Sequence, residues 1–143
     1  MPSQSKPPVF ESWGRYPKLD CRVEPLFWTD EYPRGTRLPP TVLAVGMGRS
    51  YGDVGLLEGG TMLSTRGLDR FLHFEPATGL LRCESGVTLD QILQFAVPRG
   101  WFLPVTPGTK YVSVGGAIAN DVHGKNHHVA ASFGNHVPRF ELG

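Results

Sequence analysis

Residues 107–136, PGTKYVSVGGAIANDVHGKNHHVAASFGNH, form the stretch that the rest of this chain is built to present. A glycine pair, Gly115 and Gly116, follows an apolar alternation and precedes three small residues, 117–119. Glycine lets a ligand approach the backbone closely and tolerates positive φ. The small residues suit a short helical turn whose free N–H groups can face an anion. The stretch therefore predicts a ligand-binding loop, with a solvent-exposed glycine-rich loop as the alternative.

The second half of this stretch is crowded with polar side chains, and four of the chain's five histidines lie between positions 123 and 136. Imidazole and carboxylate groups bind zinc, so His123, His127 and His128, with Asp121 as an oxygen ligand, could hold a divalent ion. Positions 123 and 127 share a face only in a helix, which Gly124 disfavours. A metal-binding module is therefore the remote alternative, and we predict no metal site.

A second glycine-rich loop, Gly46–Asp53 (GMGRSYGD), follows the apolar run Thr41–Val45, which predicts a buried strand. Its three glycines expose backbone N–H groups, while Arg49 and Ser50 add a positive charge and a hydroxyl donor. This combination predicts a nest for a pyrophosphate. The spacing matches neither the phosphate loop with G-K-[ST] nor the dinucleotide motif G-x-G-x-x-G, and a plain hairpin loop is the alternative.

Three further strands are predicted between the two loops, where apolar residues alternate with polar ones. They lie at 60–64, 71–75 and 80–85, and their close spacing predicts a meander. Another apolar run, Trp101–Val105, predicts a strand that leads into the stretch at 107–136.

The one clear helical pattern covers Thr88–Val97, where Thr88 is the predicted N-cap and Gln91 completes a capping box. Pro98 and Gly100 end the pattern. The order of elements predicts an α+β fold with a mixed sheet and flanking helices. In such a fold the two glycine loops would converge on one ligand.

The composition is that of a folded domain, with 143 residues, 40% of them hydrophobic, including eight Phe and three Trp. Eighteen Gly and thirteen Pro favour short strands and turns. A net charge of +1 leaves no basic footprint for nucleic acid. Cys21 and Cys83 are too few for a disulfide framework, and no apolar stretch suits a signal peptide or a transmembrane segment. We therefore expect a cytoplasmic protein with a proline-rich segment over 1–40 and a ligand-binding part over 41–143.

Four segments, at 46–53, 85–93 (SGVTLDQIL), 104–128 and 132–137 (SFGNHV), together resemble the flavin-binding half of the vanillyl-alcohol-oxidase type of FAD oxidoreductase, with its PCMH-type domain. Within that superfamily they look like the decaprenylphosphoryl-ribose oxidases, the flavin subunits of a sugar epimerase. The run GGAIANDVHGKNHH is the most specific part of the resemblance, which covers about residues 41–138. It implies a PCMH-type fold of which this chain holds the N-terminal part, without the second half and the substrate domain.

The resemblance also implies which residues meet the cofactor. Residues 44–53 would wrap the FAD pyrophosphate, and Gly108, residues 113–116 and residues 120–123 would line the path along the adenosine diphosphate to the flavin. Arg49 stands where many lactone-oxidising relatives carry a histidine bonded to the flavin, so non-covalent FAD is expected. The implied cofactor-binding set is Ala44, Val45, Gly46, Met47, Gly48, Arg49, Ser50, Tyr51, Gly52, Asp53, Gly108, Thr109, Ser113, Val114, Gly115, Gly116, Asn120, Asp121, Val122 and His123.

The chemistry that the resemblance implies is hydride transfer from a sugar CH–OH group to flavin N5, with His123 and Lys125 as catalytic residues. His123 would tune the flavin's charge or help to move a proton, and Lys125 would hold an anionic flavin or a substrate phosphate. The implied substrate is a sugar or a polyprenyl-phosphate sugar, and the implied protein partner is a reductase or an epimerase. Alternatives are an aldonolactone oxidase, which Arg49 disfavours, and a truncated remnant without catalysis. The fragment alone is expected to be inactive.

Overall fold

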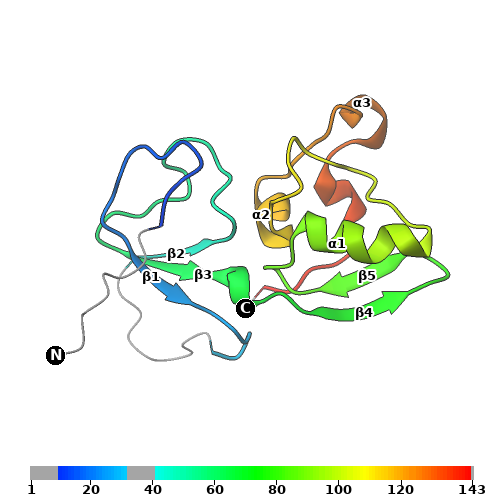
Figure 1. The fold of residues 1–143 in the computed structure, drawn as a ribbon, viewed down its shortest axis with the longest axis horizontal. Coiled ribbons are helices and arrows are strands. Elements are labelled where there is room, and N and C mark those ends of the chain that lie inside the picture. Colours follow the sequence, from blue (N-terminus) through cyan, green and yellow to red (C-terminus); the bar gives the residue numbers. More distant parts are fainter. Residues whose placement is uncertain (1–9, 32–40, 143) are drawn as a thin grey trace.

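The computed structural model describes residues 10–31 and 41–142, which form two sheet-containing units joined side by side (Figure 1). The first unit holds the strands β1 (Arg22–Pro25), β2 (Val42–Val45) and β3 (Thr61–Ser64). The second unit holds β4 (Phe71–Glu75), β5 (Leu80–Cys83), α1 (Leu89–Ala96), α2 (Val114–Ala119) and α3 (His127–Ala130). Short 3-10 turns lie at Thr65–Gly67, Val97–Arg99 and Phe133–His136. The predicted α+β class is confirmed.

The first unit is a parallel sheet with the strand order β1-β3-β2. Its central strand is covered on both faces, since Thr61, Met62 and Leu63 are all buried. Consecutive burial of this kind is typical of parallel sheets and hides the alternation of a half-exposed strand. Met62 packs against Cys21 and Val45 in a small core. The glycine loop at 46–53 therefore leaves the carboxyl end of β2, an edge strand that this core anchors.

The second unit is an antiparallel hairpin, β4–β5, covered by helix α1 (Figure 1). Helix α1 begins with the predicted capping box, in which the Thr88 hydroxyl accepts from the Gln91 N–H at 3.2 Å and the Gln91 side chain accepts from the Thr88 N–H at 2.8 Å. The ring of Phe95 lies 5.0 Å from that of Phe71 on the hairpin. The predicted helix and its start are thus confirmed.

The core of the second unit ties α2 to α1. Its buried members are Val87, Leu89, Ile92, Ala96, Val105, Ala117 and Phe133. Because Ala117 sits in the middle of α2 and is fully buried, the small-residue run is held by packing and is not a free loop. Within the two described ranges, no helix has the length and apolar character needed to cross a bilayer.

Two predicted features of the sheet are wrong. The strand at 61–64 does not form a meander with the two strands that follow; it pairs in parallel with β1 and β2, while β4 and β5 pair only with each other. Parallel and antiparallel pairing are therefore both present, in separate sheets. The run Trp101–Val105 is not a strand. Pro104 has no N–H to donate to a neighbouring strand, and Val105 is buried as part of the helical core instead.

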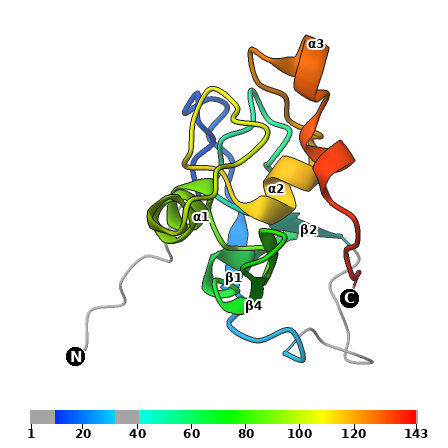
Figure 2. The ribbon, with the colours of Figure 1, turned by 90° about the vertical axis from the view of Figure 1, so that its right-hand side faces the viewer.

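The joint between the two units is closely packed. The N–H of Gly86 donates to the Leu68 carbonyl at 2.7 Å, and a Cβ at Gly86 would lie 2.0 Å from the Thr65 carbonyl oxygen. Beside it, the guanidinium of Arg70 contacts the carboxylate of Glu84 at 2.6 Å, with the Glu84 side chain only 8% exposed. The turned view shows the result, with α2 beside β2 of the first unit (Figure 2).

Candidate functional site

The loop at 46–53 is rich in backbone donors that find no acceptor among the described residues. Gly48 and Gly52 adopt left-handed conformations, with φ of 66° and 59°. Across residues 10–31 and 41–142, no N–H from Met47 to Asp53 makes a hydrogen bond to another described residue. Left-handed residues set among others are how successive N–H groups come to line a concavity that accepts an anion. The predicted nest therefore has the donors that it needs.

The root of this loop is held by the turn that follows β3. The hydroxyl of Thr65 donates to the Val45 carbonyl at 3.2 Å, and Nε of Arg66 donates to the Gly46 carbonyl at 2.9 Å. These two bonds satisfy the carbonyl groups at the end of β2. The loop's carbonyl groups near the strand are thus occupied by the protein, while its N–H groups donate to no other described residue.

The donors at the start of α2 are in a different state. The N–H of Val114 donates to the Val87 carbonyl and that of Gly115 to the Ser85 carbonyl, both at 2.8 Å. The N–H of Gly116 donates to the Ser113 hydroxyl at 3.2 Å, which makes Ser113 the N-cap. The predicted helical turn is present, but the expectation of free N–H groups there is wrong. Neighbouring carbonyls and the cap have taken the donors that an anion would need.

The two glycine-bearing segments do meet, as the sequence predicts. A Cβ placed on Gly46 would lie 2.2 Å from Oγ of Ser113, so the first residue of the loop is packed against the N-cap of α2. Ser113 is itself 3% exposed. Only glycine at position 46 leaves room for the hydroxyl. The segment at 113–116 therefore forms a wall beside the donor-rich loop.

The residues after α2 are bound largely to their own backbone. The side chain of Asn120 donates to the Gly116 carbonyl at 2.9 Å. One carboxylate oxygen of Asp121 accepts from the Gly134 N–H at 2.9 Å, and this bond is the main reason why the pKa of Asp121 is lowered. His123 is exposed and forms an isolated bridge with Ser132. Asp121 thus pins the segment around residue 134.

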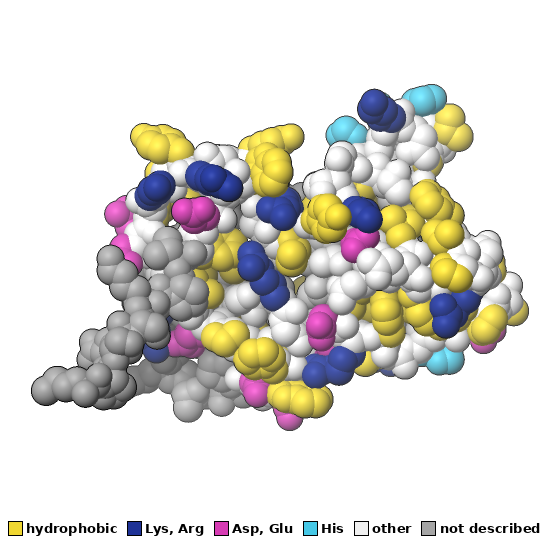
Figure 3. All heavy atoms as spheres, in the orientation of Figure 1, with side chains coloured by type: hydrophobic (Ala, Val, Ile, Leu, Met, Phe, Trp, Pro, Cys, Tyr) yellow, Lys and Arg dark blue, Asp and Glu magenta, His cyan; other side chains and the backbone are white. Residues whose placement is uncertain are grey.

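The proposed catalytic residues project from the protruding segment that leads to α3, where basic and histidine side chains gather on the surface (Figure 3). His123 and Lys125 are both exposed. The rings of His123 and His127 lie edge to face at 5.2 Å between centroids, and those of His127 and His128 at 5.8 Å. In the described part of the chain, no three His, Cys, Asp or Glu side chains are arranged to hold a metal ion. The alternative of a histidine metal site therefore finds no support in this geometry.

The other predicted cofactor residues are spread along both segments. Ala44 and Val45 end strand β2, and Val122 packs against the core of the second unit. Gly108 lies in the connection before α2 with nothing near its Cβ position, and the Thr109 hydroxyl accepts from the Tyr111 N–H at 3.2 Å. The structure brings Gly46 and Ser113 together, and it leaves Gly108 and Thr109 outside that contact.

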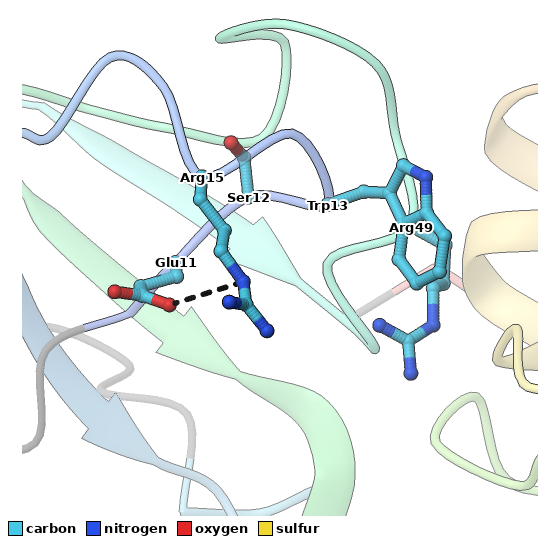
Figure 4. A pocket seen from close by; sticks show the side chains of 5 residues that line it. All are labelled: Glu11, Ser12, Trp13, Arg15 and Arg49. Carbon is cyan, nitrogen blue, oxygen red and sulfur yellow. Dashed lines mark ion pairs between the residues drawn. The ribbon is translucent and has the colours of Figure 1, made fainter.

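A hollow of about 510 Å³ beside the first loop joins Arg49, a predicted cofactor residue, to four residues of the N-terminal segment that were not predicted as site residues. Its lining consists of Glu11, Ser12, Trp13, Arg15 and Arg49 (Figure 4). Cζ of Arg49 lies 4.9 Å from the centre of the Trp13 ring. The available signal was the short motif Trp13-Gly14-Arg15, an aromatic next to a glycine and an arginine.

Comparison with known families supplies a match over most of the chain. The profile of a family described as FAD binding domain matches residues 32–142. Among solved structures, an alkyldihydroxyacetonephosphate synthase aligns with a TM-score of 0.55 at 14% identity, over 66% of this chain and 19% of that one. At this identity the likeness concerns the fold.

Curated relatives are similar over shorter regions. Decaprenylphosphoryl-beta-D-ribose oxidase of Mycolicibacterium smegmatis is 50% identical over 101 residues, which are 71% of this chain and 22% of that protein. D-lactate dehydrogenase of Anaerostipes hadrus is 32% identical over 66 residues, or 46% of this chain and 14% of that protein. The chain thus spans about a fifth of the mycobacterial relative and less of the other.

Proposed function

This chain belongs to the FAD binding domain family, and we propose that its loop at 46–53 holds the FAD pyrophosphate in a flavin oxidoreductase. The resemblance to FAD oxidoreductases expected from the sequence is thereby confirmed at the level of the family. One observation carries the proposal: the run of N–H groups from Met47 to Asp53 that donate to no other described residue, at the carboxyl end of a parallel strand. Such N–H groups can donate hydrogen bonds to an anion, and a pyrophosphate offers several acceptor oxygens.

The surrounding residues fit that group. Arg49 lies in the loop and can add charge, and the hydroxyl of Ser50 can donate. The wall at 113–116 has no free N–H at Val114, Gly115 or Gly116, so we assign it packing against the cofactor and leave the anion to the first loop. Arg49 in place of a linking histidine favours FAD that is bound without a covalent bond. Release of all flavin on acid precipitation is the expected result; flavin that stays with the pellet would overturn this assignment.

FAD, when bound, supplies the acceptor of a hydride. The chain's own contribution would be to anchor the pyrophosphate and to place His123 and Lys125 near the ring. His123 would hold or move a proton, since an imidazole nitrogen can either accept or donate one, and Lys125 would balance negative charge. Similarity to the mycobacterial oxidase supports a sugar CH–OH group, on a sugar or a polyprenyl-phosphate sugar, as the group oxidised by the whole protein.

The test is a set of parallel titrations of the purified chain with FAD, ADP and riboflavin, followed by calorimetry or flavin fluorescence. Anchoring through the pyrophosphate predicts that FAD and ADP bind and that riboflavin, which lacks it, does not. The substitutions His123→Ala and Lys125→Ala should weaken FAD binding without affecting ADP, because both side chains are assigned to the flavin end. Equal binding of riboflavin and FAD, or no binding of either nucleotide, would refute the proposed site.

Two left-handed glycines make a matched pair for the same titrations. Gly52 in the loop and Gly100 after α1 have φ of 59° and 83°, and neither has an atom within 4 Å of its Cβ position. Alanine strains the backbone at both positions to a similar degree, by about 1 kcal/mol. Gly52→Ala should weaken FAD and ADP binding, while Gly100→Ala should lower stability alone. If Gly52→Ala and Gly100→Ala changed FAD and ADP binding equally, the loop at 46–53 would not be part of the cofactor site.

A further inference from the structure

The outer face of the first glycine loop is covered by the chain's own N-terminal segment. A Cβ on Gly48 would lie 3.0 Å from the ring of Phe10 and 3.2 Å from the Glu11 carbonyl oxygen. Contact this close means that residues 10 and 11 lie directly against the backbone of the loop. The left-handed conformation of Gly48 is therefore formed against an adjoining surface.

A second contact holds the side chain at the middle of the loop. The Trp13 ring lies across the guanidinium of Arg49, at 4.9 Å from Cζ to the ring centre (Figure 4). An aromatic face attracts a guanidinium electrostatically and also limits its rotation. Trp13 keeps 58% of its surface exposed, so it contributes little to a core. Its cation–π contact is with Arg49 of the loop.

A third contact joins the same segment to the root of the loop. The guanidinium of Arg66 donates to the Gly46 carbonyl through Nε at 2.9 Å, and its Cζ lies 5.5 Å from the centre of the Phe10 ring. Phe10 thus touches the loop at Gly48 and, through Arg66, at Gly46. Residues 10–13, which we call the N-terminal clasp, contact the loop at Gly48 and Arg49 and reach its start at Gly46 through Arg66.

We propose that the N-terminal clasp is a positioning element for the cofactor site, and that Trp13 orders the loop at 46–53 before FAD arrives. The physical reason is that the N–H groups of the loop donate to no other described residue, so no hydrogen bond of their own fixes their directions. A flexible loop would lose conformational freedom on binding, and contacts that order it beforehand reduce that loss. The effect on affinity rests on the proposed function; the ordering of the loop does not.

The test compares Trp13→Ala with Trp28→Ala. Trp28 is a close control because it is 55% exposed and lies 4.0 Å from Cζ of an arginine, Arg70, but contacts the joint between the units and not the glycine loop. The first measurement needs no ligand: backbone amide order parameters by NMR relaxation. In Trp13→Ala the order parameters of the amides from Met47 to Asp53 should fall from the rigid value of about 0.85 to about 0.6 or below. In Trp28→Ala they should not change.

The second measurement is the affinity for FAD in the same variants. If the loop is competent only part of the time without its aromatic cover, the apparent dissociation constant rises by the inverse of that fraction, about fivefold for the loss of one cation–π contact. Trp13→Phe, which keeps a weaker aromatic face, should fall between wild type and Trp13→Ala. Melting temperatures of Trp13→Ala and Trp28→Ala should fall by similar amounts, which separates positioning from general stability.

Unchanged order parameters in Trp13→Ala would overturn the proposal, and so would a disordered loop that binds FAD as tightly as wild type. A chain that binds no FAD in any form would refute the proposed function instead. In that case the order parameters, measured without ligand, would still decide whether the clasp holds the loop.

Discussion

The contact between Gly46 and Ser113 can be tested by filling it. A methyl group at position 46 would lie 2.2 Å from Oγ and 3.2 Å from Cβ of Ser113. The hydroxyl is buried and caps α2 by accepting from the Gly116 N–H at 3.2 Å. It can yield to the methyl group only by leaving that cap. Gly46→Ala should therefore destabilise the protein, although the φ of Gly46 is not one that alanine avoids.

The magnitude follows from three terms. Loss of the N-cap costs about 1 kcal/mol. Forcing a methyl group into filled space costs about 1–3 kcal/mol. The reduced freedom of the unfolded chain returns about 0.4–1 kcal/mol when alanine replaces glycine at a compatible φ. We expect Gly46→Ala to lower the free energy of unfolding by about 2 kcal/mol on balance.

The assay is urea unfolding of four proteins: wild type, Gly46→Ala, Ser113→Gly and the double variant. Ser113→Gly removes both atoms that the new methyl group would contact. Because glycine is tolerated at an N-cap, this substitution should lower the free energy of unfolding by only about 0.5 kcal/mol. The double variant should be close to Ser113→Gly alone, which gives a coupling energy of about 2 kcal/mol. Gly14→Ala is the control, since nothing lies within 4 Å of its Cβ position. Additive effects, or a Gly46→Ala as harmless as the control, would falsify the contact between the two segments.

Three further predictions concern other parts of the structure. The bond from the Gly134 N–H is the main reason why the pKa of Asp121 is lowered below 3.8, so the charged carboxylate stabilises the fold above that pH and this stabilisation is lost as pH falls through the lowered pKa. Below pH 3.8 the stability of Asp121→Asn should therefore depend less on pH than that of the wild type. An unchanged slope in acid unfolding curves would contradict this. Gly86→Ala would place a methyl group 2.0 Å from the Thr65 carbonyl oxygen, which belongs to the backbone, and should lower the free energy of unfolding in urea by about 3 kcal/mol. A loss of under about 1 kcal/mol would contradict close packing at the joint between the units. Burial raises the pKa of Cys83 to about 11. In Cys21→Ser, the reaction of Cys83 with a disulfide reagent should therefore be slow at neutral pH and should become about tenfold faster per pH unit until near pH 11. A rate that levels off near the usual thiol pKa would contradict this.

Signals that depend on near neighbours in the chain were sufficient for several elements. Helix α1 and its capping box need only Thr88, Gln91 and the apolar spacing between them, and the structure confirms all three. The strand at 42–45 followed by a glycine loop was likewise predictable, because a β-branched run and three glycines favour these conformations without help from distant residues. The same local motifs carried the resemblance to the FAD family, which the match over residues 32–142 confirms.

Strand partners were decided elsewhere. The predicted alternation at 60–64 did not reveal that both faces of β3 are covered, and whether such a strand pairs with the next strand or with earlier ones depends on what packs over it. Burial against Cys21 and Val45 placed it between β1 and β2. The run at 101–105 had the composition of a strand, but its apolar residue Val105 found a place in the helical core. Apolar content says that a segment will be buried, while the partner depends on the whole fold.

The sequence by itself determined where the glycine-rich loop at 46–53 and the short helical turn after Gly115 and Gly116 lie, because these depend on residue type and short spacing. Only the tertiary structure decided which donors are free. The N–H groups of 114–116 and of 47–53 look alike in the sequence, yet the first set donates to the carbonyls of residues 85 and 87 and to the Ser113 hydroxyl, and the second donates to no other described residue. Tertiary contacts also brought residues 10–13 against the loop. A hydrogen bond needs its acceptor within about 3 Å, and only folding brings distant acceptors that close.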